Sequence, residues 1–547
     1  MRTVVDEIVD RAGGTCALTV LGGAGETIAA VPWAVVHGQA RRMATVLAAG
    51  GVGRGSRVGL VGDTGVDLVA ALQAVWLLGA AVTVLPPPAR GRLGNLVAIA
   101  ADAGLDLVVA ESDVAPLAEV TRVVSLAALA VSARAAVPAS PHRPAPEDLA
   151  ILQYTSGSTR APRGVPVTHR HLAANIAAIK EAIDFYGPRP TRMLSWLPLY
   201  HDMGLIGFLI LPMSAGCPLV LQSPLNFARR PASWFQALSR HRATTTGAPN
   251  FAYHLMTRLL AADQELDLRA VRFMLTGGEP VDAEMMDQFA GAAGRYGLDP
   301  LAIVPAYGLA ESTLAVTFSS LGAGVRVDAV DPGALEHHAR AVPATPGGPA
   351  RRLVRLGPAV RGTTLRVVDR HTGAPVGERV VGHVEIRGPS VVGHYWGEPQ
   401  PPAGCWLRTG DLGYLVDGEL VVCGRYKDVL FAAGRNIFPQ DVEAAAQVSG
   451  VRPGAAAAFG VPHDAGDRLV VAVESRAADP AQLRHDVAVA VLDEVGLTPA
   501  DVVTLLPGRL PRTSSGKLRR AETRRRYLAG EFDGARIIQP VQKGSFR

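Results

Sequence analysis

The stretch ILQYTSGSTRAPRGVPVTH, from Ile151 to His169, joins an apolar run to a loop rich in hydroxyl side chains. The apolar run predicts a buried strand, and a helix-like pattern begins at His171. The loop between them contains Thr155, Ser156, Gly157, Ser158, Thr159, Arg163 and Gly164. A strand, a Gly/Ser/Thr loop and a helix form a good anion site, because backbone N–H groups and hydroxyls point at the ligand. The stretch therefore predicts a loop that binds phosphate.

The spacing of the two glycines separates this loop from the common Walker A type. Gly157 and Gly164 are seven positions apart, and neither Lys-Ser nor Lys-Thr follows the second glycine. The loop is therefore a candidate phosphate site of another kind, with a plain Ser/Thr-rich turn as the alternative.

Strand-like and helix-like segments alternate on both sides of the loop. Before it, short strands are expected at residues 56–62, 80–86, 106–110 and 122–126, and a helix is expected at 66–79. The alternation resumes after the loop and continues to about residue 320. It predicts an α/β fold with a doubly wound sheet.

One uncharged segment, Leu68 to Leu85, is long enough to raise the question of a membrane span. Gly79 divides it, Gln73 interrupts it, and three prolines follow it. We therefore expect a buried helix followed by a buried strand, and no membrane insertion.

The composition bounds the class of protein. The 547 residues are 48% hydrophobic and 19% charged, which suits two or more domains with large cores. The net charge is only +5, and no dense basic run indicates nucleic-acid binding. Four cysteines lie far apart without metal-binding spacing, and the N-terminus is amphipathic and acidic, unlike a signal peptide. We expect a cytoplasmic protein with reduced thiols.

The character of the sequence changes twice in its second half. Residues 325–356 are rich in Pro, Gly and Arg with weak periodicity, which predicts an insertion or a long irregular loop. Strand-like segments follow, and after Arg425 a smaller unit begins with its own alternation. We place a domain boundary near Gly424, between a large domain at 1–424 and a small domain at 425–547.

Lysine is rare in this chain. Only four of the 54 basic residues are lysines, namely Lys180, Lys427, Lys517 and Lys543. A chain that uses arginine elsewhere is expected to keep lysine mainly where a compact ammonium is needed. The pattern singles out Lys427 and Lys517, with drift as the alternative.

Five further motifs follow the loop along the chain. They are TGGEP at 276–280, which ends a predicted strand; AYGLAEST at 306–313; RTGD at 408–411, which presents an acid at a turn; GRYKD at 424–428; and PRTSSGKLRR at 511–520. In this order they resemble the adenylate-forming enzymes, which include acyl-CoA synthetases, nonribosomal peptide adenylation domains and luciferases. The resemblance covers nearly the whole chain.

The resemblance is strongest to the fatty acyl-AMP ligases. It is carried by LPLYHDMGLIG at 197–207, APNFAY at 248–253, GRNIFPQDVE at 434–443, and an extra segment at about 325–356. It implies an α/β fold: a large N-terminal AMP-binding domain of two doubly wound sheets plus a small β-barrel, and a small C-terminal α+β lid domain. In that family the extra segment is thought to hamper the use of free coenzyme A.

The resemblance also implies roles for individual residues. Thr155, Ser156, Ser158 and Thr159 would donate to the ATP phosphates, Gly157 and Gly164 would let the backbone approach them, and Arg163 would supply a cation. Tyr307 would stack on adenine beside Gly278, Glu279, Pro280 and Gly308, and Asp411 and Arg425 would hold the ribose. Glu311 would ligate Mg²⁺, Lys517 would bridge the reacting carboxylate and the α-phosphate, Asp428 would be the hinge of the small domain, and His201 would be an active-site gate. Plausible walls of the acyl pocket are Met203, Ile206, Phe251 and Tyr253.

Several of these roles have plainer alternatives. Glu311 suits a solvent-facing helix position, Asp411 suits a turn, and His201 suits a hydrogen-bonded core position. The chain also departs from the usual superfamily pattern at three positions, where Arg160 replaces a glycine, Arg163 a lysine and Ala310 a threonine.

The expected reaction is the activation of a carboxylic acid, here a fatty acid, by ATP to acyl-AMP and pyrophosphate. The acyl group would then pass to the phosphopantetheine thiol of an acyl carrier protein acting in trans, in lipid, polyketide or hybrid peptide biosynthesis. Three alternatives stay open: an acyl-CoA synthetase, an amino-acid adenylation enzyme, and a non-catalytic acyl- or nucleotide-binding protein. The last is disfavoured by Lys517, Glu311 and Asp411.

Overall fold

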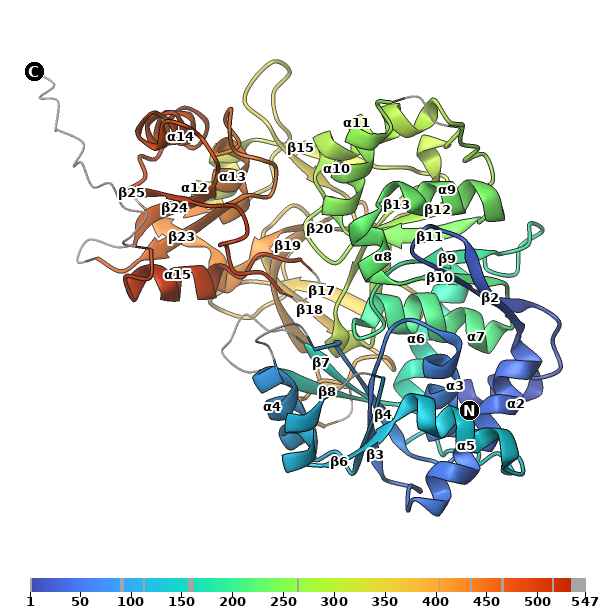
Figure 1. The fold of residues 1–547 in the computed structure, drawn as a ribbon. Helices are drawn as coiled ribbons and strands as arrows, with labels where there is room; N and C mark the ends of the chain where they lie inside the picture. Colours follow the sequence, from blue (N-terminus) through green and yellow to red (C-terminus); the bar gives the residue numbers. More distant parts are fainter. Residues whose placement is uncertain are drawn as a thin grey trace, which may run out of the picture.

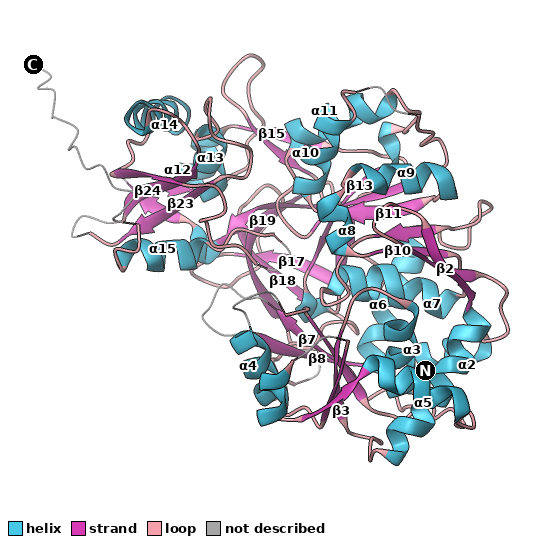
Figure 2. Ribbon diagram, viewed as in Figure 1, coloured by secondary structure: helices cyan, strands magenta, loops and turns pink. Residues whose placement is uncertain are grey.

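The computed structural model describes residues 2–88, 93–111, 114–155, 162–262, 265–402, 404–432, 435–463, 467–513 and 516–532. Two large sheets form the N-terminal part, a four-stranded sheet lies between them and the C-terminal part, and a three-stranded sheet lies near the C-terminus (Figure 1). Helices cover both large sheets (Figure 2). This is the mixed α/β architecture that the sequence predicts.

The first sheet has six strands in the order β6-β5-β3-β4-β7-β8. They are β3 (Arg57–Val61), β4 (Ala81–Leu85), β5 (Leu107–Ala110), β6 (Arg122–Ser125), β7 (Leu149–Thr155) and β8 (Arg163–Thr168). Strands β3 to β6 are parallel, and α2 (Trp33–Ala49), α3 (Val66–Trp76), α4 (Leu93–Ala103) and α5 (Leu126–Ala135) alternate with them. The predicted alternation is confirmed, and the uncharged segment at 68–85 supplies most of α3 and all of β4. No helix in the described part of the chain is long and apolar enough to cross a membrane.

The loop after β7 is not followed directly by a helix, so the predicted strand–loop–helix arrangement is wrong. Strand β8 pairs antiparallel with β7, with Thr155 opposite Arg163, and α6 (His169–Ala182) begins only after it. Residues 164–167 are buried, which favours an extended strand within the sheet. Because α6 starts at the far end of β8, its N-terminus does not face the loop. Residues 156–161 lie outside the described residues.

The second sheet has eight strands in the order β14-β13-β12-β11-β9-β10-β1-β2. They are β1 (Ala17–Leu21), β2 (Thr27–Pro32), β9 (Met193–Ser195), β10 (Leu219–Gln222), β11 (Thr245–Ala248), β12 (Phe273–Gly277), β13 (Ile303–Gly308) and β14 (Ala315–Phe318). The helices of this part are α1 (Val4–Asp10), α7 (Leu211–Ala215), α8 (Pro224–Arg229), α9 (Ala232–His241), α10 (Asn250–Leu259) and α11 (Ala283–Gly294). One buried core contains Leu60 and Val82 of the first sheet and Leu194 and Leu219 of the second, so the two sheets pack together.

The third sheet is antiparallel and contains β17 (Thr364–Val368), β18 (Gly382–Arg387), β19 (Leu407–Val416) and β20 (Glu419–Arg425). It stands where the resemblance implies a small β-barrel. Asp411 lies inside β19, so the predicted turn at 408–411 is wrong. Gly410 has a φ of 83°, a value that glycine adopts easily, and the strand continues through it.

Residues 325–356 are ordered, so the prediction of an irregular loop is wrong. β15 (Val327–Val330) pairs antiparallel with β16 (Arg351–Val354), and α12 (Pro332–His338) lies between them. Asp331 caps α12 by accepting the Ala334 N–H at 2.6 Å. Many contacts of this segment are ion pairs, such as Arg379 with Asp328 at 3.0 Å. Its apolar periodicity is therefore weak although it is folded. We call residues 327–354 the ribbon segment.

The C-terminal part has a core of its own. Its elements are β21 (Leu430–Ala432), β22 (Arg435–Ile437), α13 (Pro439–Ala445), β23 (Ala456–Val461), β24 (Arg468–Glu474), α14 (Pro480–Val495), β25 (Asp501–Leu505) and α15 (Arg520–Leu528). Ile437, Val471 and Val487 belong to a buried cluster separate from that of the two large sheets. The boundary near Gly424 stays a prediction, and we refer to this part as the small domain.

Candidate active site

Tyr307, Asp411 and Arg425 join the second and third sheets. Tyr307 lies in β13, and its hydroxyl donates to Asp411 Oδ2 at 2.5 Å. Arg425 Nε lies 3.4 Å from Asp411 Oδ1, across the pairing of β19 with β20. Burial raises the pKa of Asp411 although Arg425 opposes it, and Asp411 in turn raises the pKa of Arg425. An aromatic ring beside a carboxylate and a cation suits a nucleoside.

The turn at 278–280 follows β12 directly and lies beside β13, which carries Tyr307. Gly278 has a φ of 81°, which favours glycine. Burial raises the pKa of Glu279, opposed by the nearby Lys517. A Cβ at Gly308 would lie 2.2 Å from the Leu314 carbonyl oxygen, so only glycine fits there. The predicted adenine-binding residues are thus adjacent.

Lys517 reaches this turn from the small domain. A Cβ built on Gly278 would lie 3.8 Å from Lys517 Nζ, which places the ammonium over the turn. The neighbouring Gly516 packs 3.7 Å from the Phe251 ring by the same measure. Thr513 Oγ1 accepts the Lys517 N–H at 3.0 Å, and Lys517 O accepts the Thr513 N–H at 2.8 Å. No described residue pairs with the ammonium, so its charge is open to a ligand.

His201 and Asp202 lie near the same lysine. His201 Nδ1 is 2.6 Å from Asp202 Oδ1, which also accepts the Met203 N–H at 2.7 Å. Burial alone would raise the pKa of Asp202, but His201 and Lys517 outweigh it and hold the value at about 2. Asp202 is therefore ionised and orients the imidazole, so that Nε2 is the nitrogen left for a ligand.

Glu311 lies in the short turn η4 (Ala310–Ser312) after β13. Two residues later, Thr313 has a φ of 68° and a ψ of −60°, a strained conformation for a β-branched residue. Its hydroxyl donates to Ser390 O at 2.7 Å. The Tyr395 hydroxyl donates to Glu311 Oε1 at 2.5 Å, and Oε2 has no partner among the described residues. Such strain is often found at functional sites.

Arg163 and Gly164 form the described end of the predicted phosphate loop, and Thr155 forms its start. The Arg163 guanidinium carbon lies 3.4 Å from the centre of the Tyr395 ring and the side chain pairs with Glu398. Tyr395 therefore contacts both Arg163 and Glu311. The predicted phosphate ligands Ser156, Gly157, Ser158 and Thr159 lie outside the described residues, as does Arg160.

The predicted hinge residue Asp428 lies in the short turn η5 (Tyr426–Asp428) after β20. Arg520 Nη1 is 3.5 Å from Asp428 Oδ2, and the same guanidinium donates to Glu443 at 2.6 Å. The Asp428 side chain is thus held by another residue of the small domain, and its role as a hinge stays a prediction.

The four predicted wall residues of the acyl pocket are not alike. Met203 and Ile206 are buried in a π-helical segment, Met203–Ile210. Tyr253 is fully buried and donates to Leu275 O at 2.5 Å. Phe251 is 45% exposed and lies next to the lysine loop. Their pocket role stays a prediction.

Four residues of this region were not assigned roles from the sequence: Asp202, Tyr395, Glu398 and Arg520. Tyr395 and Glu398 belong to GHYWGEP at 393–399, whose only signal is a pair of aromatic residues between glycines. Asp202 is part of the segment at 197–207, but a single carboxylate beside a histidine is a weak signal.

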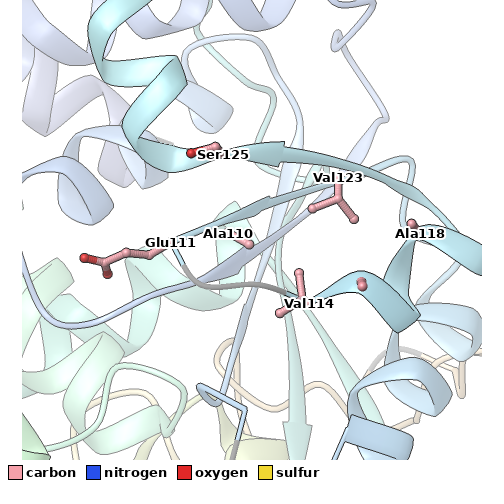
Figure 3. A pocket seen from close by; sticks show the side chains of 7 residues that line it. Ala110, Glu111, Val114, Ala118, Val123 and Ser125 are labelled. Atoms are coloured by element: carbon pink, nitrogen blue, oxygen red, sulfur yellow. The ribbon is translucent and has the colours of Figure 1, made fainter.

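A separate cavity of about 300 Å³ lies at the ends of β5 and β6 (Figure 3). Its polar lining groups are already bonded: Glu111 accepts the Asp63 N–H at 2.7 Å, and Ser125 caps α5 by accepting the Ala128 N–H at 3.3 Å. None of the predicted site residues within the described ranges lines it. The predicted site side chains that the structure describes instead lie mainly where the second sheet, the third sheet and the small domain meet.

Comparison with known proteins identifies one family. The family model described as AMP-binding enzyme matches residues 12–396. A putative acyl-CoA synthetase of Caulobacter vibrioides is 36% identical over 93% of this chain and 92% of its own. JamA of Moorena producens, a medium-chain-fatty-acid–[acyl-carrier-protein] ligase, is 36% identical over 71% of this chain and 69% of its own. A solved structure from work on fatty acyl-adenylate ligases of E. coli and L. pneumophila has a TM-score of 0.89 and 34% identity, covering 97% of this chain and 98% of that one.

Proposed function

The chain belongs to the AMP-binding enzyme family and is an adenylate-forming acid ligase, and from this premise we propose that it is a fatty acyl-AMP ligase serving a carrier protein. It activates a fatty acid with ATP and transfers the acyl group to the phosphopantetheine thiol of that carrier. The similarity to JamA and to the fatty acyl-adenylate ligase structure supports this choice of acid and acceptor.

In the first step, a carboxylate oxygen of the acid attacks the α-phosphorus of ATP. The bond from that phosphorus to the pyrophosphate oxygen breaks, and acyl-AMP and pyrophosphate form. Negative charge from both reactants concentrates at the α-phosphate, where a fixed cation lowers the barrier. The ammonium of Lys517 lies over the 278–280 turn and pairs with no described residue, which supports this role. Tyr307, Asp411 and Arg425 hold the nucleoside.

Mg²⁺ enters this proposal together with ATP. The ion prefers oxygen ligands and is usually bound by one or two carboxylates together with substrate phosphates. Glu311 fits this need, because Tyr395 holds Oε1 and Oε2 has no partner among the described residues. When bound, the ion neutralises phosphate charge, and Glu311 orients it.

The choice of thiol acceptor rests on the ribbon segment, whose helix α12 contacts the small domain (Figure 1). Glu336 of α12 accepts hydrogen bonds from Arg435 Nε at 2.8 Å and Nη2 at 2.5 Å. Its backbone oxygen accepts Asn436 Nδ2 at 2.7 Å. Three hydrogen bonds thus join the helix to β22.

The β16 side of the ribbon segment makes a second attachment. Arg351 Nε lies 2.8 Å from Asp441 Oδ1, and its guanidinium carbon is 4.3 Å from the centre of the Phe438 ring. The Arg351 side chain is only 11% exposed, so solvent screens this contact weakly. The ribbon segment is also joined to the third sheet, where Tyr414 donates to Asp328 at 2.6 Å. It therefore links the small domain to the body of the protein.

This link supports a carrier protein as the acceptor. Thiol transfer requires the small domain to turn about the hinge, and the ribbon segment holds it with Lys517 at the nucleotide side. A carrier protein brings its own docking surface, which can compensate for the broken contacts. Free coenzyme A lacks such a surface and is therefore the poorer acceptor.

The test compares three products of the full-length enzyme: acyl-AMP, acyl-CoA and acylated holo-carrier. We expect rapid acyl-AMP formation, little acyl-CoA and efficient carrier loading. A double substitution, Glu336→Ala with Arg351→Ala, should raise acyl-CoA output without lowering acyl-AMP formation. The matched control is Arg361→Ala, which removes an exposed arginine paired with Glu181. Equal rates of acyl-CoA and acyl-AMP formation by the wild type would instead favour an acyl-CoA synthetase, the name carried by the Caulobacter relative.

A further inference from the structure

One segment, residues 390–398, contacts both the Glu311 turn and the end of the phosphate loop. The Val392 N–H donates to Glu311 O at 2.8 Å, and the Trp396 N–H donates to Gly164 O at 2.8 Å. Ser390 O accepts the Thr313 hydroxyl at 2.7 Å. These contacts fix the segment between two motifs that are about 150 residues apart in sequence. The Tyr395 side chain of this segment lies between the Glu311 carboxylate and the Arg163 guanidinium.

Each of the two parts of the Tyr395 side chain has a different partner. Its hydroxyl donates to Glu311 Oε1 at 2.5 Å, the length of a charge-assisted hydrogen bond. Its ring lies under the Arg163 guanidinium, 3.4 Å from the ring centre.

Arg163 suits this arrangement better than lysine would. A guanidinium is planar and stacks on an aromatic face, whereas an ammonium is a compact, strongly hydrated charge. The other partner of Arg163 is Glu398, but the two side chains are 42% and 48% exposed. An ion pair so open to water holds a side chain only weakly. The Tyr395 ring is therefore the main support of Arg163.

We propose that Tyr395 is a positioning residue of the nucleotide site, whose hydroxyl orients the Glu311 carboxylate and whose ring orients the Arg163 guanidinium. The inference rests on the adenylation proposed above. Holding Oε1 leaves Oε2 of Glu311 to face the ion that accompanies ATP. Holding the guanidinium over the ring keeps a cation at the described end of the phosphate loop.

The two parts of this role can be separated by substitution. Tyr395→Phe removes the hydroxyl and keeps the ring, so it should weaken ion binding and leave Arg163 in place. Tyr395→Leu removes both, so it should also weaken binding of the phosphates. Arg163→Lys keeps a cation but loses the stacking, so it should weaken phosphate binding and leave ion binding near wild type.

The first measurement is Mn²⁺ binding by electron paramagnetic resonance, in the presence of a non-hydrolysable ATP analogue. Outer partners of metal ligands typically contribute about 10- to 100-fold to metal affinity. We therefore expect about tenfold weaker Mn²⁺ binding by Tyr395→Phe and by Tyr395→Leu. The second measurement is the KM for ATP in pyrophosphate exchange, which should rise in Tyr395→Leu and Arg163→Lys by more than in Tyr395→Phe.

The matched controls are Tyr186→Phe and Tyr186→Leu. Tyr186 is 63% exposed and also lies beneath cations, with Arg11 at 5.7 Å and Lys180 at 6.0 Å, but it touches none of the predicted site residues that the structure describes. Both variants should bind Mn²⁺ and ATP as the wild type does. Melting temperatures of all variants identify any general loss of folding, and Tyr395→Phe keeps the ring volume.

Mn²⁺ affinity of Tyr395→Phe within about twofold of wild type overturns the role of the hydroxyl. An unchanged KM for ATP in Tyr395→Leu overturns the role of the ring. A wild type that binds no Mn²⁺ with the nucleotide overturns the proposal entirely. If the wild type forms no acyl-AMP from any fatty acid but binds Mn²⁺ and nucleotide, the proposed function fails while the binding series still decides the role of Tyr395.

Discussion

The proposed nucleoside end and the proposed phosphate end of the site are held in different ways. At the nucleoside end, Asp411 and Arg425 face each other across paired strands, and the Asp411 side chain is 8% exposed while that of Arg425 is 52% exposed. At the phosphate end, Arg163 and Glu398 meet only through side chains that are 42% and 48% exposed. Backbone pairing and the burial of Asp411 fix the first end, whereas the ion pair at the second end is open to water and Arg163 rests mainly on the Tyr395 ring. Polar substitutions should therefore matter more at the first end than at the second.

The largest effect is expected from Lys517→Ala, because this lysine brings the charge of the small domain to the nucleoside end. Loss of one donor that stabilises transition-state charge typically lowers the rate by about 10²-fold or more. Pyrophosphate exchange should fall by that amount, while ATP binding measured by calorimetry stays close to wild type. Lys517→Arg serves as the control for charge alone. Pyrophosphate exchange near the wild-type rate in Lys517→Ala would show that Lys517 takes no part in adenylation.

Two carboxylates near the proposed nucleoside end, the buried Asp411 and the largely buried Asp202, differ in their response to pH. The pKa of Asp202 is held at about 2, below its usual value, so its ionised form stabilises the fold at higher pH. This contribution is fully present above the unfolded-state pKa and is lost as pH falls through the folded-state value. Asp411 has a raised pKa, so its contribution has the opposite sign: it is present at low pH and is lost as pH rises through the folded-state value.

Asp202→Asn should therefore lower stability at neutral pH. The lowered pKa corresponds to about 2 kcal/mol in the free energy of unfolding, because the Asp202 side chain is only 13% exposed and screening is weak. Urea denaturation at pH 7 and pH 3 measures the difference between variant and wild type. The difference should shrink at pH 3. A constant difference at both pH values would contradict the assigned role of the contact between Asp202 and His201.

Asp411→Asn should act on nucleotide binding and not on the fold. Loss of a charged acceptor for the ribose should raise the KM for ATP about tenfold, which is about 1.4 kcal/mol. Because the pKa of Asp411 is raised, the wild-type KM should rise on the acid side as the carboxyl becomes protonated, whereas the KM of the variant should stay flat. Stability at neutral pH should not fall. An unchanged KM for ATP in Asp411→Asn would show that Asp411 does not bind the nucleoside.

Local sequence patterns predict the nucleoside end better than the phosphate end. Tyr307 and the 278–280 turn lie at the ends of neighbouring parallel strands, and such strand ends meet at one edge of a sheet. Lys517 could be singled out because lysine is rare in the chain and its motif is specific. The sequence does not predict the hairpin of β7 and β8. The short buried strand β8 lies between the loop and a helix-like pattern, and it is too short to give a pattern of its own.

The remaining errors concern contacts between distant residues. Glu336 meets Arg435, about 100 residues away, so no local pattern shows that the ribbon segment is ordered. Tyr395 joins Arg163 to Glu311 by the same kind of long-range contact. The sequence predicts a turn at Asp411 because aspartate often forms turns, yet pairing with β20 keeps this residue in a strand. Side-chain contacts across the fold are therefore the part that sequence patterns do not reveal.

The smallest effect is expected from Glu398→Gln, which tests the exposed ion pair between Arg163 and Glu398 at the proposed phosphate end. This substitution removes the charge paired with Arg163 and keeps the size of the side chain. Exposed ion pairs contribute about 0–1 kcal/mol, so the KM for ATP should change by less than about fivefold. Any change should diminish at high salt, because the pair is open to screening. A KM shift as large as that of Asp411→Asn would mean that Glu398, and not the Tyr395 ring, determines where Arg163 lies, and the two ends of the site would then depend equally on charge.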